Sequence, residues 1–180
     1  MKDRLLKQTK REYGPGQRLA ALLIEGLFFM VVLPYVLAAL AELLDPGLHL
    51  PRFVHNPITP AVGWLLIAAG WLFAMWSIYA QFALGRGTPV PLMATQKLVV
   101  QPPYTYCRNP MALGAIVLYL GVSVLLGSVS AALLVVLGAA WLLAYIKRIE
   151  EKELEARFGQ EDVEYRRRTP FLLPRFRRPG

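Results

Sequence analysis

The sequence predicts an all-α, polytopic membrane protein with about four transmembrane helices, a C-terminal helical hairpin, and a cytoplasmic loop and tail. Of its 180 residues, 56% are hydrophobic, and the mean hydropathy is +0.41. The apolar residues fall in long blocks that carry few or no charges, which is the signature of membrane-spanning helices. Lysine and arginine gather in alternate connecting segments. These observations together predict the number of spans and their orientation.

Two apolar blocks predict the first two spans. Residues 19–44 carry only Glu25 and Glu42, which we expect toward the membrane interfaces. Residues 60–84 carry no charge. Each block, as a helix, is long enough to cross a hydrocarbon core of about 30 Å. Pro34 lies inside the first block and predicts a kink there.

The third apolar block predicts a hairpin of two spans. Residues 109–146 carry no charge, and as one straight helix they would extend about 57 Å. This length is nearly twice the hydrocarbon thickness, so the block must fold back. The segment Gly127–Ser130 is its most turn-like part. We therefore predict spans at about 111–126 and 130–147.

The distribution of basic residues predicts that both termini are cytoplasmic. Residues 1–18 hold six Lys and Arg, residues 85–110 hold three, and the chain from Lys147 onward holds ten. The segment 45–59 has only Arg52. Four crossings place the three basic segments on one side, which the positive-inside rule assigns to the cytoplasm. Attraction to anionic headgroups then explains the net charge of +8 without a nucleic-acid partner.

One domain, residues 1–180, accounts for the whole chain. It comprises a cytoplasmic arm (1–18), the first two spans (19–84), and a region with the inner loop, hairpin and C-terminal motif (85–175). Five prolines between 85 and 110 exclude a regular helix there, and the apolar residues among them favour an ordered loop. The single Cys107 excludes an internal disulfide, and no metal site is expected.

The end of this loop concentrates side chains suited to binding a ligand. Four lie within six positions before the third span: Tyr104, Tyr106, Arg108 and Asn109. An interfacial aromatic belt with one topogenic arginine would account for these residue types. It does not account for the flanking prolines at 102, 103 and 110, which make the segment rigid. A rigid polar loop at membrane depth is tolerated where it lines a cavity or packs against protein.

The helix of the fourth span is predicted to continue into water over residues 147–158 and to end at Gly159. Glu150 and Glu151 lie about one turn beyond the membrane, near the segment from which Arg108 emerges. Ordinary solvated charge pairs would explain them equally well. If they are desolvated, however, they need a partner or a cationic ligand.

These two stretches, in order and spacing, resemble the isoprenylcysteine carboxyl methyltransferase and phospholipid methyltransferase family of integral membrane enzymes. The family pattern G-P-Y-x-x-x-R-[HN]-P-x-Y-x-G corresponds to residues 102–114. The pattern E-E-x-x-L-x-x-x-F-G-x-x-Y-x-x-Y corresponds to residues 150–165, and a proline-flanked tail follows at 170–174. The resemblance covers about residues 85–175. The sequence departs from the pattern at four positions, which are Pro102, Ala112, Asp162 and Phe171.

The resemblance implies methyl transfer from S-adenosyl-L-methionine to a lipid-like or membrane-partitioned acceptor, such as a prenylcysteine carboxylate or a phospholipid amine. A small apolar metabolite also remains open as the acceptor. Arg108 and Glu151 are the expected catalytic residues. The expected cofactor-binding residues are Tyr104, Tyr106, Arg108, Asn109, Glu150 and Glu151. Arginine would hold the donor's carboxylate, a glutamate its ammonium, and the tyrosines its adenine or sulfonium. The tail is expected to fold back over this site.

Two other classes of protein compete with this interpretation. A non-enzymatic assembly factor, or an inactive member of the same family, would keep the fold without turnover. Binding of S-adenosylmethionine would separate an assembly factor from an enzyme, and a turnover assay would identify an inactive member. A small transporter would need ionisable side chains near mid-membrane, and the spans lack them there.

The predicted topology places Arg52 and Gly180 on opposite sides of the membrane, because an odd number of spans separates them. Single cysteines introduced at the two positions should therefore react with an impermeant reagent from opposite sides of sealed vesicles. Labelling of both positions from one side would overturn the four-span topology.

Overall fold

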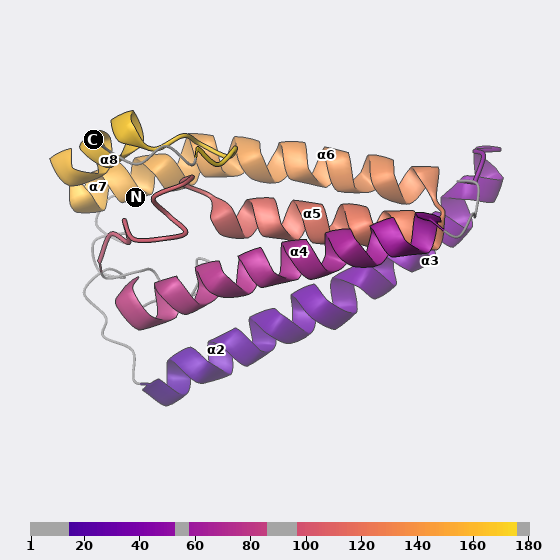
Figure 1. The fold of residues 1–180 in the computed structure, drawn as a ribbon, viewed down its shortest axis with the longest axis horizontal. Helices are drawn as coiled ribbons and strands as arrows, with labels where there is room; N and C mark the ends of the chain where they lie inside the picture. The colour runs from indigo at the N-terminus through magenta and orange to yellow at the C-terminus, as the bar shows by residue number, and fades with distance from the viewer. Residues whose placement is uncertain (1–14, 53–57, 86–96, 176–180) are drawn as a thin grey trace.

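A computed structural model describes residues 15–52, 58–85 and 97–175 of the chain (Figure 1). Over these ranges the secondary structure is helical and contains no β-strand, which confirms the predicted all-α class. Most of the predicted arm, part of the 45–59 loop with His55, and the first part of the 85–110 segment lie outside the described residues.

The first two predicted spans are continuous helices. The first comprises α2 (Pro15–Leu27), a π-helical turn η1 (Phe28–Val32) and α3 (Leu33–Gly47). The second comprises α4 (Ile58–Ala80) and a π-helical turn η2 (Gln81–Gly85). By length and composition, Leu19–Gly47 and Ile58–Gly85 are each able to cross a membrane.

The hairpin forms with its turn where the sequence predicts it. Its helices are α5 (Pro110–Leu126) and α6 (Val129–Tyr145), and α6 continues through η3 (Ile146–Glu150) into α7 (Glu151–Phe158). Gly127 adopts a left-handed conformation, with φ of 62°, that favours glycine. The side chain of Ser128 accepts a hydrogen bond from the amide of Ala131 and so caps α6.

Gly159 ends α7 as predicted, with φ of 58°, and a last helix α8 (Gln160–Arg168) follows. The joined helix from α6 through α7, Val129–Phe158, is long and apolar enough to span a membrane, and α5 is a shorter apolar helix of 17 residues. At 1.5 Å per residue α5 is about 26 Å long, close to the hydrocarbon thickness.

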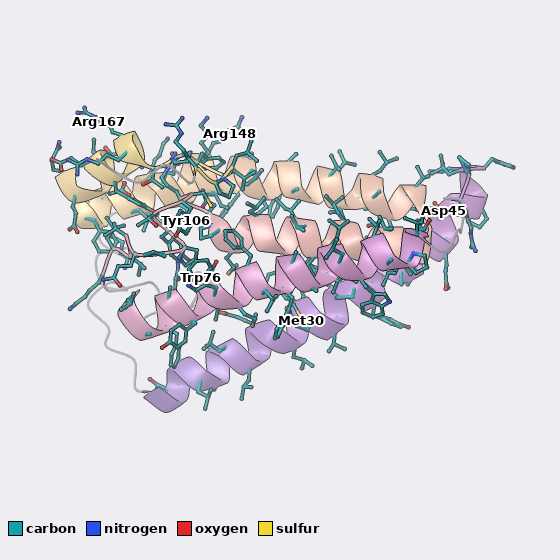
Figure 2. The ribbon with its side chains drawn as sticks, viewed as in Figure 1. Met30, Asp45, Trp76, Tyr106, Arg148 and Arg167 are labelled. Carbon is teal, nitrogen blue, oxygen red and sulfur yellow. The ribbon has the colours of Figure 1, made fainter. Side chains whose placement is uncertain are left out.

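Polar contacts join the end of α3 and the segment after it to the turn of the hairpin. An Asp45 carboxylate oxygen accepts a hydrogen bond from the backbone amide of Ser130 at 3.0 Å. Arg52 pairs with Ser128 in an isolated antiparallel bridge. Both contacts lie at the end of the molecule opposite α7 and α8 (Figures 1 and 2). A chain that crosses the membrane four times brings these two connections to the same end, as the sequence predicts.

Helices α4 and α5 lie side by side and touch through backbone (Figure 1). A Cβ atom added to Gly70 would lie 2.5 Å from both the carbonyl oxygen of Gly114 and the amide nitrogen of Leu118. A Cβ atom on Gly114 would lie 2.7 Å from the Gly70 carbonyl oxygen and from the amide nitrogen of Ala74. Small residues allow this close approach, which provides much of the packing energy between helices in lipid.

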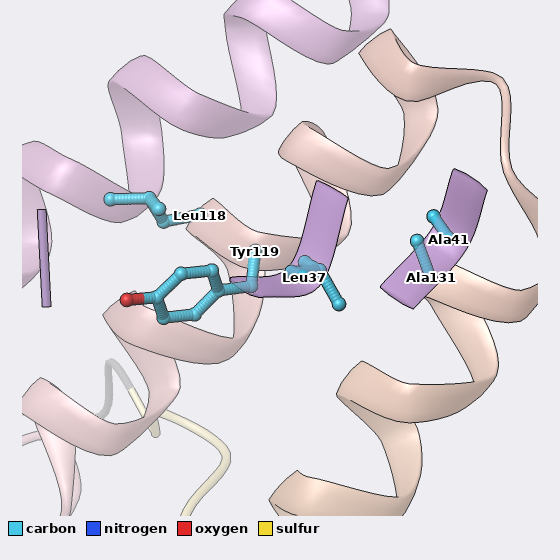
Figure 3. Close-up of a cluster of buried hydrophobic side chains, with 5 residues drawn as sticks. All are labelled: Leu37, Ala41, Leu118, Tyr119 and Ala131. Carbon is cyan, nitrogen blue, oxygen red and sulfur yellow. The ribbon is translucent and has the colours of Figure 1, made fainter. Parts of the chain in front are cut away.

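A hydrogen bond from α5 satisfies a backbone group that the first span leaves open. The amide of Leu33 bonds to the carbonyl of Phe28, in the π-helical register. In that register the carbonyl of Phe29 would need the amide of residue 34, which is Pro34 and has no N–H. The hydroxyl of Tyr119 donates to this carbonyl instead. Tyr119 belongs to the buried cluster in Figure 3, which comprises Leu37, Ala41, Leu118, Tyr119 and Ala131.

The two carboxylates of the first block differ in exposure. Glu42 is exposed, whereas Glu25 is buried and occurs four residues after buried Ala21, on the same helical face. The expectation that Glu25 lies toward a membrane interface stays a prediction, because burial within the protein does not fix its depth. Its side chain faces the protein rather than the lipid.

We expect Gly70→Ala to destabilise the fold, because the added methyl group would force the backbones of α4 and α5 apart. Overpacking of this kind costs about 1–3 kcal/mol. Gly138→Ala in α6 is the matched control, since a Cβ atom there would meet nothing within 4 Å. The measurement is the unfolding temperature of each variant in one detergent. Equal unfolding temperatures for the two variants would contradict the close contact.

Candidate functional site

The two polar stretches found in the sequence meet at one end of the helical bundle. The loop before α5, the helices α7 and α8, and the tail to residue 175 gather there, opposite the α5–α6 turn (Figure 1). The hairpin produces this meeting, because α5 begins and α6 ends at the same end of the bundle. Side chains separated by a complete hairpin therefore come into contact.

Tyr104 lies in the packed wall of the site. Its side chain is 6% exposed and packs with Ala80 of α4 and with Val99. The hydroxyl of Tyr165 donates to the Tyr104 carbonyl at 2.7 Å, which fixes α8 against the loop. Burial raises the pKa of Tyr104, and the nearby charge of Glu150 raises it further. The predicted contact of Tyr104 with a cofactor stays a prediction.

Tyr106 is the more exposed of the two predicted tyrosines. It is half-buried, and its ring meets that of Trp76 edge-on with 6.1 Å between centroids (Figure 2). Asn109 uses its side-chain amide to donate to the carbonyl of Phe171 at 2.9 Å. Asn109 therefore anchors the tail in this structure, and Tyr106 offers an aromatic surface beside it.

Arg108 and Glu151 form an ion pair across the hairpin. Nη1 of Arg108 lies 2.5 Å from Oε1 of Glu151, and the two side chains are only 16% and 14% exposed. The predicted closeness of these residues is confirmed. Nε of Arg108 is buried and has no hydrogen-bond partner among the described residues. The ring of Phe171 packs on the guanidinium, with Cζ 5.3 Å from the ring centroid.

A second arginine, which the sequence interpretation missed, completes the charge cluster. Arg166 of α8 lies 3.8 Å from Oε2 of Glu151 through Nη1, and 2.9 Å from Oδ2 of Asp162 through Nε. It also donates a hydrogen bond to Glu155. Asp162 and Arg166 are four residues apart on one helix, a spacing that predicts a pair. That signal was present, but it is common in charged tails.

Glu150 precedes Glu151 at the end of η3 and is half-buried. Within the described ranges it forms no ion pair, unlike Glu151. Its negative charge is close enough to raise the pKa of Tyr104. Glu151 pairs with the arginines, whereas Glu150 lies outside that cluster. Its predicted part in cofactor binding stays a prediction.

The C-terminal tail folds back onto the loop, as predicted. The amide of Arg108 donates to the carbonyl of Pro170 at 2.9 Å, and the amide of Arg175 donates to the carbonyl of Tyr106 at 3.0 Å. Phe171, where the family pattern has arginine, lies between two cations. Lys147 Nζ is 5.9 Å from its ring centroid, and Arg108 approaches it as described above.

This arrangement is suited to a small zwitterionic ligand with an aromatic part. Guanidinium groups bind carboxylates through paired hydrogen bonds, and carboxylates bind ammonium groups. The half-buried positions of Arg108 and Glu151 reduce solvent screening of both interactions. The fold therefore defines a polytopic membrane protein, and a cluster of half-buried charged residues lies at one end of its helical bundle.

Comparison with family models identifies the family. Residues 58–161, more than half of the chain, match the phospholipid methyltransferase model. The chain belongs to the phospholipid methyltransferase family, which confirms the resemblance seen in the motifs. Comparison with curated proteins gives no match. The family supports methyl transfer on lipid-type substrates as the activity.

We expect Asn109→Ala to loosen the tail, because it removes the side-chain donor to the Phe171 carbonyl. One such hydrogen bond contributes about 1 kcal/mol. Hydrogen exchange at the amides of Arg108 and Arg175, which bond across the same contact, should accelerate roughly fivefold. The exposed Gln101→Ala in the same loop is the control. Unchanged exchange in Asn109→Ala would show that its side chain does not hold the tail.

Proposed function

We propose that the protein transfers a methyl group from S-adenosyl-L-methionine to a phospholipid amine that reaches the site from the bilayer. The observation that carries this proposal is the half-buried Arg108–Glu151 pair, which the folded-back tail covers at one end of a membrane bundle. The family match supports the reaction class and a lipid-type acceptor.

The residues present fit the proposed donor. Arg108 has a buried Nε with no hydrogen bond among the described residues, so this guanidinium retains capacity for a carboxylate. Glu151 is suited to the donor's ammonium group. Tyr106 is half-buried and is suited to the adenine or the sulfonium. When bound, S-adenosylmethionine supplies an electrophilic methyl group on a sulfonium.

The protein's own contribution to this reaction is positioning and shielding. Methyl transfer is an in-line displacement, so holding the two reactants in line provides much of the acceleration. Pro170 and Phe171 cover Arg108 from the tail side through the contacts described above. This cover restricts water at the charged residues and strengthens their electrostatic interactions.

The chemistry of the acceptor adds one requirement. A protonated amine must lose a proton before it attacks, whereas a carboxylate such as that of a prenylcysteine needs no base. Glu150 adjoins Glu151, is half-buried and lies outside the arginine cluster. We assign it the role of accepting this proton. Incubating membranes with labelled donor and identifying the labelled lipid tests the acceptor, and labelled prenylcysteine esters would contradict it.

The proposal also assigns the site to the cytoplasmic face. Lys147, whose Nζ lies 5.9 Å from the ring centroid of Phe171, and the arginines of α7 and α8 lie at the end where the site forms, as the positive-inside rule requires of a cytoplasmic end. A soluble donor would enter from this side, and the acceptor's headgroup would lie at the same interface. Both termini are then cytoplasmic.

We expect Arg108→Ala and Glu151→Ala each to weaken S-adenosylmethionine binding. Losing a charged hydrogen-bond partner costs about 1.5–3 kcal/mol, which corresponds to roughly 10- to 150-fold in affinity. The matched controls are Arg168→Ala and Glu164→Ala, because these residues form an exposed pair at 3.9 Å on α8. Isothermal titration of the purified protein in detergent gives the affinities. Wild-type affinity in both site variants would show that the donor binds elsewhere.

A further inference from the structure

Two arginines lie close to Glu151, each beside a different oxygen atom of its carboxylate. Oε1 lies 2.5 Å from Nη1 of Arg108, and Oε2 lies 3.8 Å from Nη1 of Arg166. The two arginines come from different parts of the chain, the loop before α5 and the helix α8. Glu151 is therefore oriented from both sides, and removing one arginine leaves the other in place.

Arg166 has acidic partners of its own that fix its position. Nε lies 2.9 Å from Oδ2 of Asp162, and the guanidinium also bonds to Glu155. Asp162 is only 1% exposed. Its Oδ2 and the Nε of Arg166 form an ion pair, and within the described residues neither atom has a hydrogen bond that meets the geometric criteria. A buried carboxylate is costly unless a cation compensates it, so Asp162 and Arg166 hold each other in place. Arg166 does not depend on Glu151 for its position.

When the proposed donor binds, Arg108 would have two anionic partners. Its guanidinium pairs with Glu151 in this structure, and under the proposed function it also binds the donor's carboxylate. If Arg108 turned to that carboxylate before the donor's ammonium reached Glu151, the largely buried Glu151 would carry an uncompensated charge, which is strongly unfavourable. The position of Arg166 prevents this, because it remains beside the other oxygen of Glu151.

We propose that Arg166, fixed by Asp162 and Glu155, is a positioning residue that holds Glu151 in its charged orientation while Arg108 binds the donor. This inference rests on the proposed function for the identity of the ligand. The contact between Arg166 and Glu151 itself does not depend on it. Residues 162 and 166 lie beyond the part of the chain that the family model matches, 58–161.

The charges of the cluster agree with this role. Two arginines, Arg108 and Arg166, face three carboxylates: Glu151, Glu155 and Asp162. The cluster therefore has one negative charge in excess. S-adenosylmethionine carries one net positive charge, from its sulfonium beside a zwitterionic amino acid, whereas its demethylated product is neutral overall. Without Arg166 the cluster would have two negative charges in excess, and with it the excess matches the single positive charge of the donor.

The test is a double-mutant cycle of Arg166→Gln with Glu151→Gln, measured in two ways. In titrations with S-adenosylmethionine, Arg166→Gln alone should weaken binding roughly tenfold, as expected for one charged contact. Arg166→Lys should restore part of this loss, because it keeps the charge but not the fork of the guanidinium. In the Glu151→Gln background, Arg166→Gln should have little further effect. Arg168→Gln, on the exposed pair, is the control.

The second measurement is the unfolding temperature of the four proteins without ligand. A non-additive effect is expected there too, because Nη1 of Arg166 lies 3.8 Å from Oε2 of Glu151 in this structure. Additive effects on both affinity and unfolding temperature would overturn the positioning role. Failure of the wild-type protein to bind S-adenosylmethionine would instead overturn the proposed function, and the ligand-free cycle would then still decide whether Arg166 holds Glu151.

Discussion

The ion pair between Arg108 and Glu151 is the contact on which the architecture of the site depends. It joins residues 43 positions apart, at the two ends of a hairpin that is otherwise apolar. Neither charge can lie within the hydrocarbon, so both must leave the bilayer at the same face. Outside the hydrocarbon, each residue then has the other as its nearest opposite charge. The hairpin brings the pair together, and the pair fixes how the loop before α5 lies against α7.

The position of this end of the bundle depends on the packing of α4 against α5. The contact of Gly70 with Gly114 holds α4 and α5 at backbone distance, and the start of α5 is the end of the site loop. Ala80 of α4 then packs on Tyr104, and Trp76 meets Tyr106 edge-on. Close helix packing in lipid depends on small residues rather than on exclusion of water. The glycine contact therefore positions Tyr104 and Tyr106 through α4.

Sequence patterns were sufficient for the spans and for the residues at both ends of the hairpin. Charge-free length predicted the fold-back near Gly127, and the motifs placed Arg108 and Glu151 together. The orientation of Glu150 relative to Glu151 could not be predicted in this way. A π-helical turn, Ile146–Glu150, precedes α7 and adds a residue to the turn, which rotates every later side chain relative to α6. The spacing of apolar residues in the sequence does not reveal such a π-helical turn.

The role of Arg166 could not be predicted for a different reason. In sequence it is one of three consecutive arginines, and its pair with Asp162 is indistinguishable from the exposed pair of Arg168 with Glu164. The path of the chain distinguishes them, because α8 turns one face toward Glu151 after Gly159. In the folded chain Asp162 is only 1% exposed, whereas Glu164 is exposed to solvent. Asp162 departs from the family pattern at the position where its carboxylate holds this arginine.

The departure at residue 171 has a related consequence. An arginine there would be a further cation beside Arg108 and Lys147, and it would compete with Arg108 for Glu151. Phe171 instead presents a ring to both cations and leaves the Nη1 of Arg108 to the carboxylate. The ring covers the guanidinium without using its donors, so Arg108 can be shielded from water and still bind. In this chain Phe171 of the tail covers Arg108, and Arg166 of α8 provides the second positive charge beside Glu151.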